Sequence, residues 1–375
     1  MSEHMGDNKK KDKSQNILSC VILIVVSFII GIVLAIFAPN LFDGIDFYEI
    51  PLIFLAFFLS LPLHIILHEA GHLLGGLLSG YDFIMFRLFN TVWIKTDKGI
   101  SKRRQQVLGL LGQALMMPPE DEDKPPFLLY HSSGFLVNLL TGILLIILGN
   151  LISNSTISLI VYSAAAAAIL LFFVNAIPKM PNDGYNILIQ LKNPEATTEL
   201  TKMLRLYGEL VRGTSFTELQ DYIELNLVHS LENPNNVTFL TAQAAAYMEQ
   251  FDFEQAREIY TRLWDQRDDL LEPHKPDVYL NYLFTLLMTE PKHGDITTLK
   301  ESTVLQNYSK AKLSDVLKTR AAEALYLEGN FSLAKELLVE GRPMIAQAPT
   351  VAEENLEYQL YDYLDAEIVR LENES

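Results

Sequence analysis

The sequence predicts a mainly α-helical membrane protein in two parts. The first part is a polytopic bundle of four transmembrane helices with a short re-entrant β-hairpin, and the second is a soluble domain of α-helical repeats. Four long runs of almost uncharged, apolar residues fall in the first half of the 375 residues. Most of the net charge of −17 falls in the second half, where residues 201–375 hold 30 acidic and 16 basic side chains. From about Glu195 onward the hydrophobic pattern has a helical period throughout.

A short basic tail, residues 1–16, precedes the first apolar run, Ile17–Phe37. This run of 21 residues is long enough to cross a bilayer. A cleaved signal peptide is the alternative, but its apolar region is normally shorter and ends at a small-residue cleavage site. We therefore expect an uncleaved helix whose N-terminus is cytoplasmic. The single cysteine, Cys20, lies in this run, so an intrachain disulfide is excluded.

Three further spans are expected at Pro51–Ser79, Phe127–Ile152 and Ile157–Ile177. Their orientation follows from the Lys and Arg residues in the short flanking loops. Basic side chains occur in the tail and in the loop between the second and third spans, whereas residues 38–50 and 153–156 contain none. We expect both termini to be cytoplasmic, in a multi-pass protein of a bacterial-type plasma membrane.

The loop between the second and third spans contains a candidate hairpin, Tyr81–Lys95, with Asn90 as its turn. This segment is rich in β-branched and aromatic residues, which favour strands. An interfacial belt of aromatic residues without strands is the alternative. Further along, Leu108–Met117 has the composition of an apolar segment lying on the membrane. The acidic, proline-bounded stretch Pro118–Pro126 is typical of an exposed linker.

The second span contains the sequence His68-Glu69-Ala70-Gly71-His72. On a helix the two histidines lie on one face, about 6 Å apart along the axis, so both rings can reach one metal ion. Glu69 lies beside that face, where it can act on a metal-bound water. Ionisable side chains are costly inside a membrane, which favours a functional site over a chance occurrence of the pattern.

A hydrolytic zinc site needs a third protein ligand, and Asp183 is the candidate. It follows the cytoplasmic end of the fourth span, where Pro178 breaks the helix and Gly184 permits a close backbone approach. Taken alone, Asp183 would be read as a solvated residue at a helix end. His64 lies one turn before His68, and we expect it to be a packing or supporting residue, since His68, His72 and Asp183 already complete a catalytic set.

These features resemble the site-2 protease family of intramembrane zinc metalloproteases, over roughly Pro51 to Leu191. The resemblance rests on three motifs: HExxH at His68, Glu69 and His72; Asn-x-x-Pro…Asp-Gly at Asn175, Pro178, Asp183 and Gly184; and a Gly…Asn pair at Gly134 and Asn138. The chain departs from the family at Phe135, where proline is usual, and at Asn182, where leucine is usual.

The resemblance implies an enzyme that holds one Zn²⁺ on His68, His72 and Asp183. Glu69 would act as general base in hydrolysis of transmembrane or membrane-anchored peptides, such as signal-peptide-like substrates, near the cytoplasmic membrane boundary. Asn138 and Asn175 would contact the substrate or the oxyanion, although a helix-packing role for Asn138 is the alternative. The hairpin would correspond to the family's re-entrant β-element, whose exposed edge could hold an unwound substrate as an added strand.

In the second half, Ala246–Tyr260 aligns with Ala324–Leu338, with small and aromatic residues at the same offsets. The pattern resembles helix pairs of tetratricopeptide repeats, with a degenerate repeat at Val278–Lys300 between them. A generic stack of helical hairpins is the alternative. Such stacks commonly bind peptides or proteins, so a protein partner is expected here. A nucleic-acid partner is not expected, because no domain has a basic face.

The predicted organisation is a tail at 1–16, a first helix at 17–37, a metalloprotease core at 49–192 and a cytoplasmic helical domain at 193–375. Two other functions are compatible with parts of the sequence. A catalytically silent membrane scaffold would act through its helical domain, but it does not explain a complete set of ligands with a general base. A metal transporter would need a polar pathway, and the spans offer little beyond the site itself.

Overall fold

The computed structural model describes residues 45–96, 99–104, 111–119, 126–179, 182–227 and 234–374. The predicted tail, the first span at Ile17–Phe37 and Cys20 lie outside these residues. Contacts between residues divide the chain into two compact units. The first unit includes residues 124–196 and the helix before residue 81, and the second includes residues 82–110, 115–123 and 197–375.

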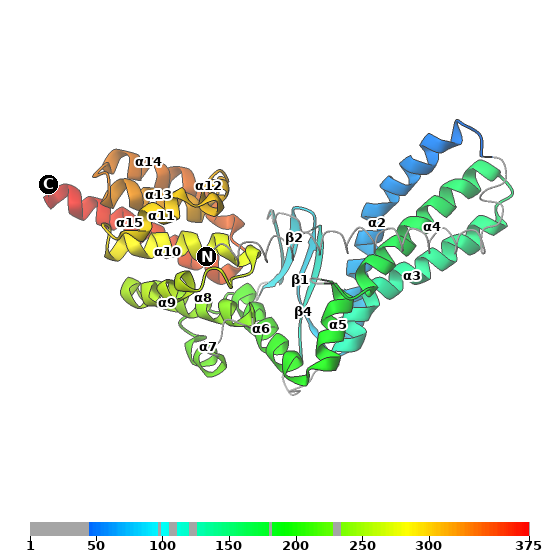
Figure 1. The fold of residues 1–375 in the computed structure, drawn as a ribbon, viewed down its shortest axis with the longest axis horizontal. Helices are drawn as coiled ribbons and strands as arrows, with labels where there is room; N and C mark the ends of the chain where they lie inside the picture. The colour runs from blue at the N-terminus through cyan, green and yellow to red at the C-terminus, as the bar shows by residue number, and fades with distance from the viewer. Residues whose placement is uncertain are drawn as a thin grey trace, which may run out of the picture. The chain divides into compact units, whose positions relative to one another are not determined.

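Three long helices form the body of the first unit and lie alongside one another (Figure 1). They are α2 (Glu49–Leu78), α3 (Phe127–Leu151) and α4 (Ser155–Ala176). Each is long and apolar enough to cross a membrane, and they coincide with the second, third and fourth predicted spans. A short helix, α5 (Asp183–Lys192), packs against α3 and α4.

Small residues let α2 and α3 approach closely. A Cβ atom at Gly71 would lie 2.6 Å from the Ser133 carbonyl oxygen, and one at Gly75 would lie 2.1 Å from Ser133 Oγ. Glycine at these positions therefore brings the backbones of α2 and α3 into contact, which is how helices pack tightly within membranes. Helix α2 then ends in a Schellman motif, in which Gly80 is left-handed (φ 79°) and Tyr81 N–H donates to the Gly76 carbonyl.

A four-stranded sheet follows α2, with strand order β3-β2-β1-β4. Its strands are β1 (Asp82–Leu88), β2 (Thr91–Thr96), β3 (Gly99–Arg104) and β4 (Gly112–Met117). Strands β1 and β2 are antiparallel, with Met85 opposite Ile94, and Asn90 lies in the turn between them. The predicted hairpin is thus part of a larger sheet, and its re-entrant position stays a prediction. The segment expected to lie on the membrane, Leu108–Met117, contributes the edge strand β4, whose Leu115 and Met117 side chains join the buried cluster of the sheet.

Helix α6 (Pro194–Arg212) provides two apolar faces within the second unit. One face, with Leu204 and Val211, packs against buried residues of β1, β2 and β4. The other, with Leu206 and Leu210, joins the core of the helical domain. By residue contacts, β1, β2 and β3 group with the C-terminal helices, whereas residues 111–114, which include the start of β4, group with the first unit. The predicted metalloprotease core at 49–192 stays a prediction.

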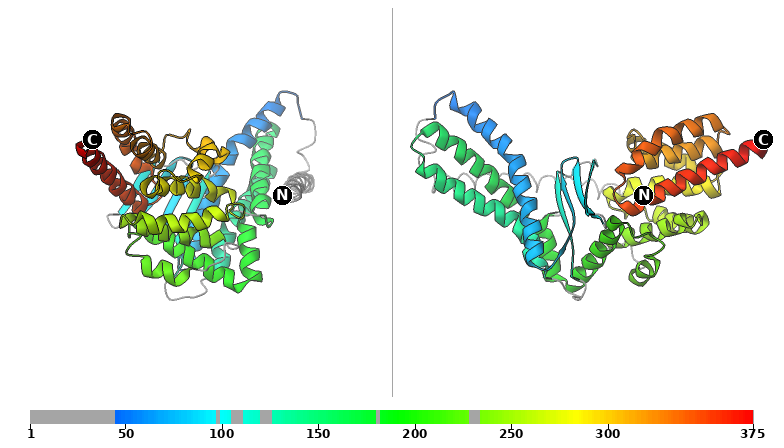
Figure 2. Two further views of the ribbon diagram at one scale, coloured as in Figure 1. Left: turned by 60° about the vertical axis from the view of Figure 1, so that its left-hand side comes forward. Right: turned by 180° about the vertical axis from the view of Figure 1, so that it is seen from behind.

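The helical domain consists of hairpins stacked side by side (Figure 2). Its further elements are α7 (Gln220–Asn226), α8 (Pro234–Glu249), α9 (Phe253–Asp265), η2 (Glu272–His274), α10 (Lys275–Thr289), α11 (Asp295–Glu301), α12 (Thr303–Tyr308), α13 (Ser314–Tyr326), α14 (Phe331–Gly341), η3 (Arg342–Gln347) and α15 (Val351–Glu374). The two aligned segments are the hairpins α8–α9 and α13–α14. The expected degenerate repeat between them contains α10 and α11.

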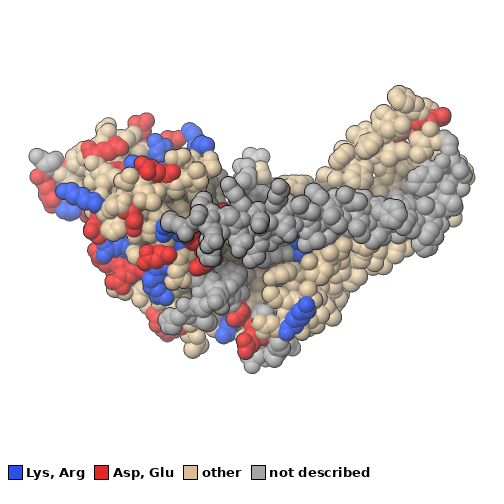
Figure 3. All heavy atoms as spheres, viewed as in Figure 1, with Lys and Arg blue, Asp and Glu red and all other residues tan. Residues whose placement is uncertain are grey.

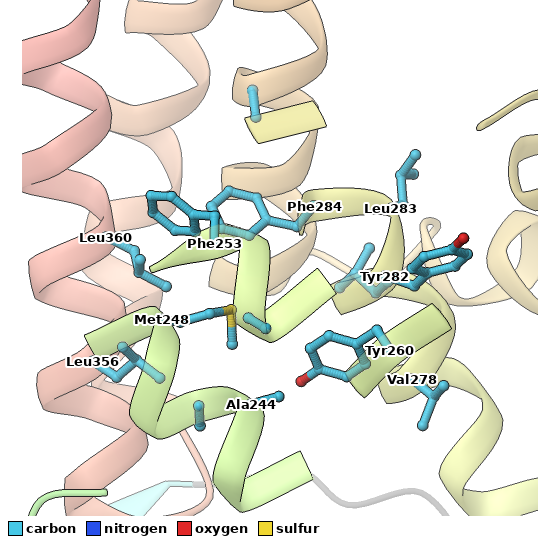
Figure 4. Close-up of a cluster of buried hydrophobic side chains, with 14 of the residues drawn as sticks. Ala244, Met248, Phe253, Tyr260, Val278, Tyr282, Leu283, Phe284, Leu356 and Leu360 are labelled. Atoms are coloured by element: carbon cyan, nitrogen blue, oxygen red, sulfur yellow. The ribbon is translucent and has the colours of Figure 1, made fainter. Parts of the chain in front are cut away.

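The two hairpins repeat the same local chemistry. Asp252 Oδ1 caps α9 through Gln255 N–H, and Asn330 Oδ1 caps α14 through Leu333 N–H at the equivalent position. The residue before each cap is left-handed, with φ 59° at Phe251 and φ 60° at Gly329. Behind the turns, aromatic and aliphatic side chains from several hairpins form one continuous core (Figure 4).

Charged side chains are distributed unevenly over the chain. On the face shown in Figure 3, Lys, Arg, Asp and Glu cover the helical domain, whereas the described parts of the three long helices show almost only uncharged residues. This distribution suits one part of the chain to lipid and the other to water.

Candidate metal centre

Two helices of the first unit bring together three side chains that could hold a metal ion. His68 and His72, on α2, have their Nε2 atoms 3.1 Å apart. Asp183, the first residue of α5, places Oδ2 3.2 Å from each of these nitrogens. In the part of the chain that the structure describes, this is the one cluster of His, Cys, Asp or Glu whose ligand atoms all lie within 4.8 Å of one another.

The donor set fits a zinc ion. Zinc takes His nitrogen and carboxylate oxygen at about 2.0–2.2 Å in a tetrahedral arrangement, so neighbouring donors around it are about 3.3 Å apart. The three separations observed here, 3.1, 3.2 and 3.2 Å, match that spacing. Three protein donors also leave one tetrahedral position open, as in catalytic zinc sites. Asp183 contributes a carboxylate oxygen and the two histidines contribute ring nitrogens, which are donor types that zinc takes.

Helix α3 orients the His72 ring. His72 Nδ1 lies 2.8 Å from the Tyr130 carbonyl oxygen, so Nδ1–H donates and Nε2 keeps its lone pair for a metal. Gly134 leaves the space that the ring occupies, since a Cβ atom there would lie 2.3 Å from His72 Nε2. The other ring, His68, has its Nδ1 atom 3.3 Å from the Asn138 side-chain amide.

Asn182 positions the third ligand. Its Nδ2 donates to the carbonyl groups of Val174 and Ile177 at the end of α4, at 2.6 and 2.7 Å. Its Oδ1 accepts from Lys179 N–H and from Tyr185 N–H, and the second of these bonds caps α5. One side chain thus ties the broken end of α4 to the start of α5. Asn182 is the residue at which leucine is usual in the family that the sequence resembles. Its hydrogen bonds hold the start of α5, where Asp183 lies.

Glu69 is buried beside the metal ligands, with 8% of its surface exposed. The backbone of Gly112 approaches its carboxylate so closely that a Cβ atom there would lie 2.7 Å from Oε1. Two residues further on, the Ala114 carbonyl accepts from Tyr130 Oη at 2.8 Å. The segment from Gly112 to Ala114 therefore lies directly against the candidate base.

The structure brings His68, Glu69, His72 and Asp183 together and places Asn138 beside them. Asn175 Nδ2 instead donates to the Leu171 carbonyl of its own helix, at 2.9 Å. His64 Nε2 lies 3.0 Å from the Ala164 carbonyl of α4, which links two helices and agrees with the packing role expected for it.

Sequence reasoning missed three neighbours of the site: Gly112, Tyr130 and His131. Gly112 contacts Glu69 through its backbone, and Tyr130 contacts His72 through its carbonyl group. Both contacts join residues far apart in the sequence, so no local pattern predicts them. His131 is buried in α3, 7% exposed, with its ring centroid 4.8 Å from that of Tyr130. It could have been found, because it is an ionisable residue inside an apolar span, the same signal that singled out His68 and His72.

The arrangement can hold a metal ion and place a carboxylate next to it, in a setting largely closed to water. Comparisons with models of known protein families, with curated proteins and with solved structures found no match to this chain.

Proposed function

We propose that this protein is an intramembrane zinc metalloprotease of the site-2 protease type. The observation that carries the proposal is the convergence of His68 and His72 on α2 with Asp183 on α5, at separations suited to zinc, beside the buried carboxylate of Glu69. Two segments distant in the sequence supply this set, within helices apolar enough to span a membrane. The third donor does not belong to the HExxH pattern, so its approach to both histidines supports a functional site over a chance occurrence.

When bound, zinc would polarise the scissile carbonyl and make a water molecule acidic enough to attack it near neutral pH. Glu69 would take the proton from the attacking water and pass it to the leaving amine. The close approach of the Gly112 backbone would hold this carboxylate in place, so little reorganisation would be needed before the proton moves. Burial of the site excludes bulk water, which strengthens the electrostatic effect of the ligands.

The substrate would be a transmembrane or membrane-anchored peptide, cut near the cytoplasmic boundary. The distribution of Lys and Arg supports this side, because it orients the chain in a plasma membrane with both termini in the cytoplasm. The helical domain would then face the cytoplasm and bind a substrate or a regulatory protein, as stacked helical hairpins commonly do.

The test is to replace Glu69 by Gln and compare the peptides that accumulate in membranes. We expect Glu69→Gln to retain zinc and to slow cleavage at least about 100-fold, the usual contribution of a general base. Glu49→Gln is the matched control, because Glu49 is a buried carboxylate at the other end of α2 that bonds to Thr156. It should cleave at the normal rate.

Zinc content of the purified protein completes the test. The unmutated chain should hold about one ion, and Asp183→Ala should lose it. Full zinc occupancy with no peptide accumulating in Glu69→Gln cells would argue against proteolysis. Absence of zinc from the unmutated protein would favour a scaffold that acts through its helical domain.

A further inference from the structure

We propose that Asn138 is a positioning residue that fixes the proton of His68 on Nδ1 and thereby leaves Nε2 free to bind the metal. This inference rests on the proposed function above, and it gives Asn138 a role different from direct contact with substrate. The residue acts through His68 and touches neither the substrate nor the reacting atoms.

The first step concerns the chemistry of the ring. A neutral imidazole carries one proton, either on Nδ1 or on Nε2. To bind a metal through Nε2, His68 must carry its proton on Nδ1, and a buried N–H group needs an acceptor. Asn138 Nδ2 lies 3.3 Å from His68 Nδ1, and Asn138 is fully buried.

The second step concerns the amide itself. Asn138 has one acceptor atom, Oδ1, and one donor group, Nδ2, which exchange places when the amide turns by half a rotation. Oδ1 has no hydrogen-bond partner among the described residues. When the amide is turned by half a rotation, Oδ1 takes the place of Nδ2 and accepts from His68 Nδ1–H. Only this orientation of the amide is compatible with a metal on His68 Nε2.

The third step is a comparison with the other histidine. His72 Nδ1 donates to the Tyr130 carbonyl, a backbone acceptor on the same helix α3. Helix α3 would thus supply a hydrogen-bond acceptor to each of the two histidine rings. The acceptor for His72 is a backbone carbonyl, whereas the acceptor for His68 is the Asn138 side chain. A substitution can remove the acceptor of His68 without changing that of His72, so the proposal can be tested on one ligand at a time.

The experiment measures zinc affinity of the full chain in detergent, by competition with a chelator whose absorbance reports free Zn²⁺. Asn138→Leu keeps the approximate size and removes the acceptor, and we expect its zinc affinity to fall about 10- to 100-fold, as for other partners of metal-bound histidines. Asn138→Asp keeps an acceptor and should bind zinc as tightly as the unmutated chain or more tightly. Thr141→Val is the control, because Thr141 lies on α3 and its hydroxyl donates to the Val137 carbonyl of the same helix.

Cobalt substitution gives a second readout that a change in stability alone would not move. The visible absorption of Co²⁺ depends on the geometry of its ligands, so Asn138→Leu should alter the spectrum whereas Thr141→Val should not. If Asn138→Leu does not fold, Asn138→Ala takes its place with the same expected loss.

Unchanged zinc affinity and an unchanged cobalt spectrum in the Leu or Ala variant would overturn the proposal. An equal loss in Asn138→Asp would overturn it too, because the acceptor is retained there. Zinc affinity that depends on Asn138, in a protein that cleaves no peptide, would leave this inference intact and reject the protease. Absence of zinc from the unmutated chain would overturn both.

Discussion

Gly134 determines where the His72 ring can lie. The backbone of α3 passes so close to this ring that any larger residue at position 134 would occupy the space of Nε2. Ser133 is packed in the same way against Gly71 and Gly75 of α2. Single atoms in the contact between α2 and α3 thus set the position of a metal ligand.

We expect Gly134→Ala to weaken zinc binding at least about tenfold, because the new methyl group would displace His72 from its position. Gly142→Ala is the matched control on the same helix. A Cβ atom there would lie 2.9 Å from Ile169 Cγ1, so it disturbs packing against α4 but no ligand. Zinc titration and thermal unfolding of both variants distinguish the two effects. Equal zinc affinity in the two variants would contradict this account of Gly134.

At the scale of single elements, the junction between α4 and α5 shows how a helix break becomes a ligand position. Asn182 bonds to the last turn of α4 and caps α5 with the same amide. Because Asp183 directly follows Asn182, the bonds that fix the cap also fix the position of the candidate ligand.

Asn182→Leu introduces the residue that is usual in the family that the sequence resembles. It should destabilise the protein by about 1 kcal/mol through loss of the cap. It should also weaken zinc binding, since Asp183 loses its anchor. Asn154→Ala removes a comparable cap at the start of α4, where Asn154 Oδ1 accepts from Ile157 N–H. We expect similar unfolding temperatures for the two variants but normal zinc affinity only for Asn154→Ala. Normal zinc affinity in Asn182→Leu would show that α5 is held by other contacts.

At the scale of the whole molecule, the excess of acidic residues in the helical domain makes stability depend on pH. Glu353 belongs to a capping box with Thr350 at the start of α15. Burial and the nearby Asp277 carboxyl raise the pKa of Glu353 to about 7. Between its ordinary pKa and this value the native state binds more protons than the unfolded chain, so the free energy of unfolding rises as pH falls.

Thermal unfolding should therefore occur at a higher temperature at pH 6 than at pH 8. Glu353→Gln preserves the capping box, which accepts either residue, and removes the titrating group. We expect this variant to unfold with a weaker dependence on pH. If the unfolding temperature of Glu353→Gln changes with pH as much as that of the unmutated protein, other groups cause the pH dependence.

The sequence alone could predict most of this architecture where the signals are local. Hydropathy found α2, α3 and α4, and the spacing of His68 and His72 follows from one helical turn. Asp183 could be inferred because the expected topology puts it at the same membrane boundary as the two histidines. Strand β3 was not predicted, because three of its six residues are Lys102, Arg103 and Arg104 and the segment lacks the apolar and β-branched composition of a strand. The contacts of Asn138 with His68 and of Gly112 with Glu69 depend on how packed elements rotate about their axes, which no periodicity encodes.

The order of the ligands along the chain also bears on how such a protein is made. His68 and His72 enter the membrane early, whereas Asp183 follows the last apolar helix and its Asn182 anchor needs the end of α4. During synthesis, the three donors can meet only after α4 has been inserted and α5 has left the ribosome. A partly made chain would hold no complete set of donors, so the proposed hydrolysis would begin only after the bundle around them was finished.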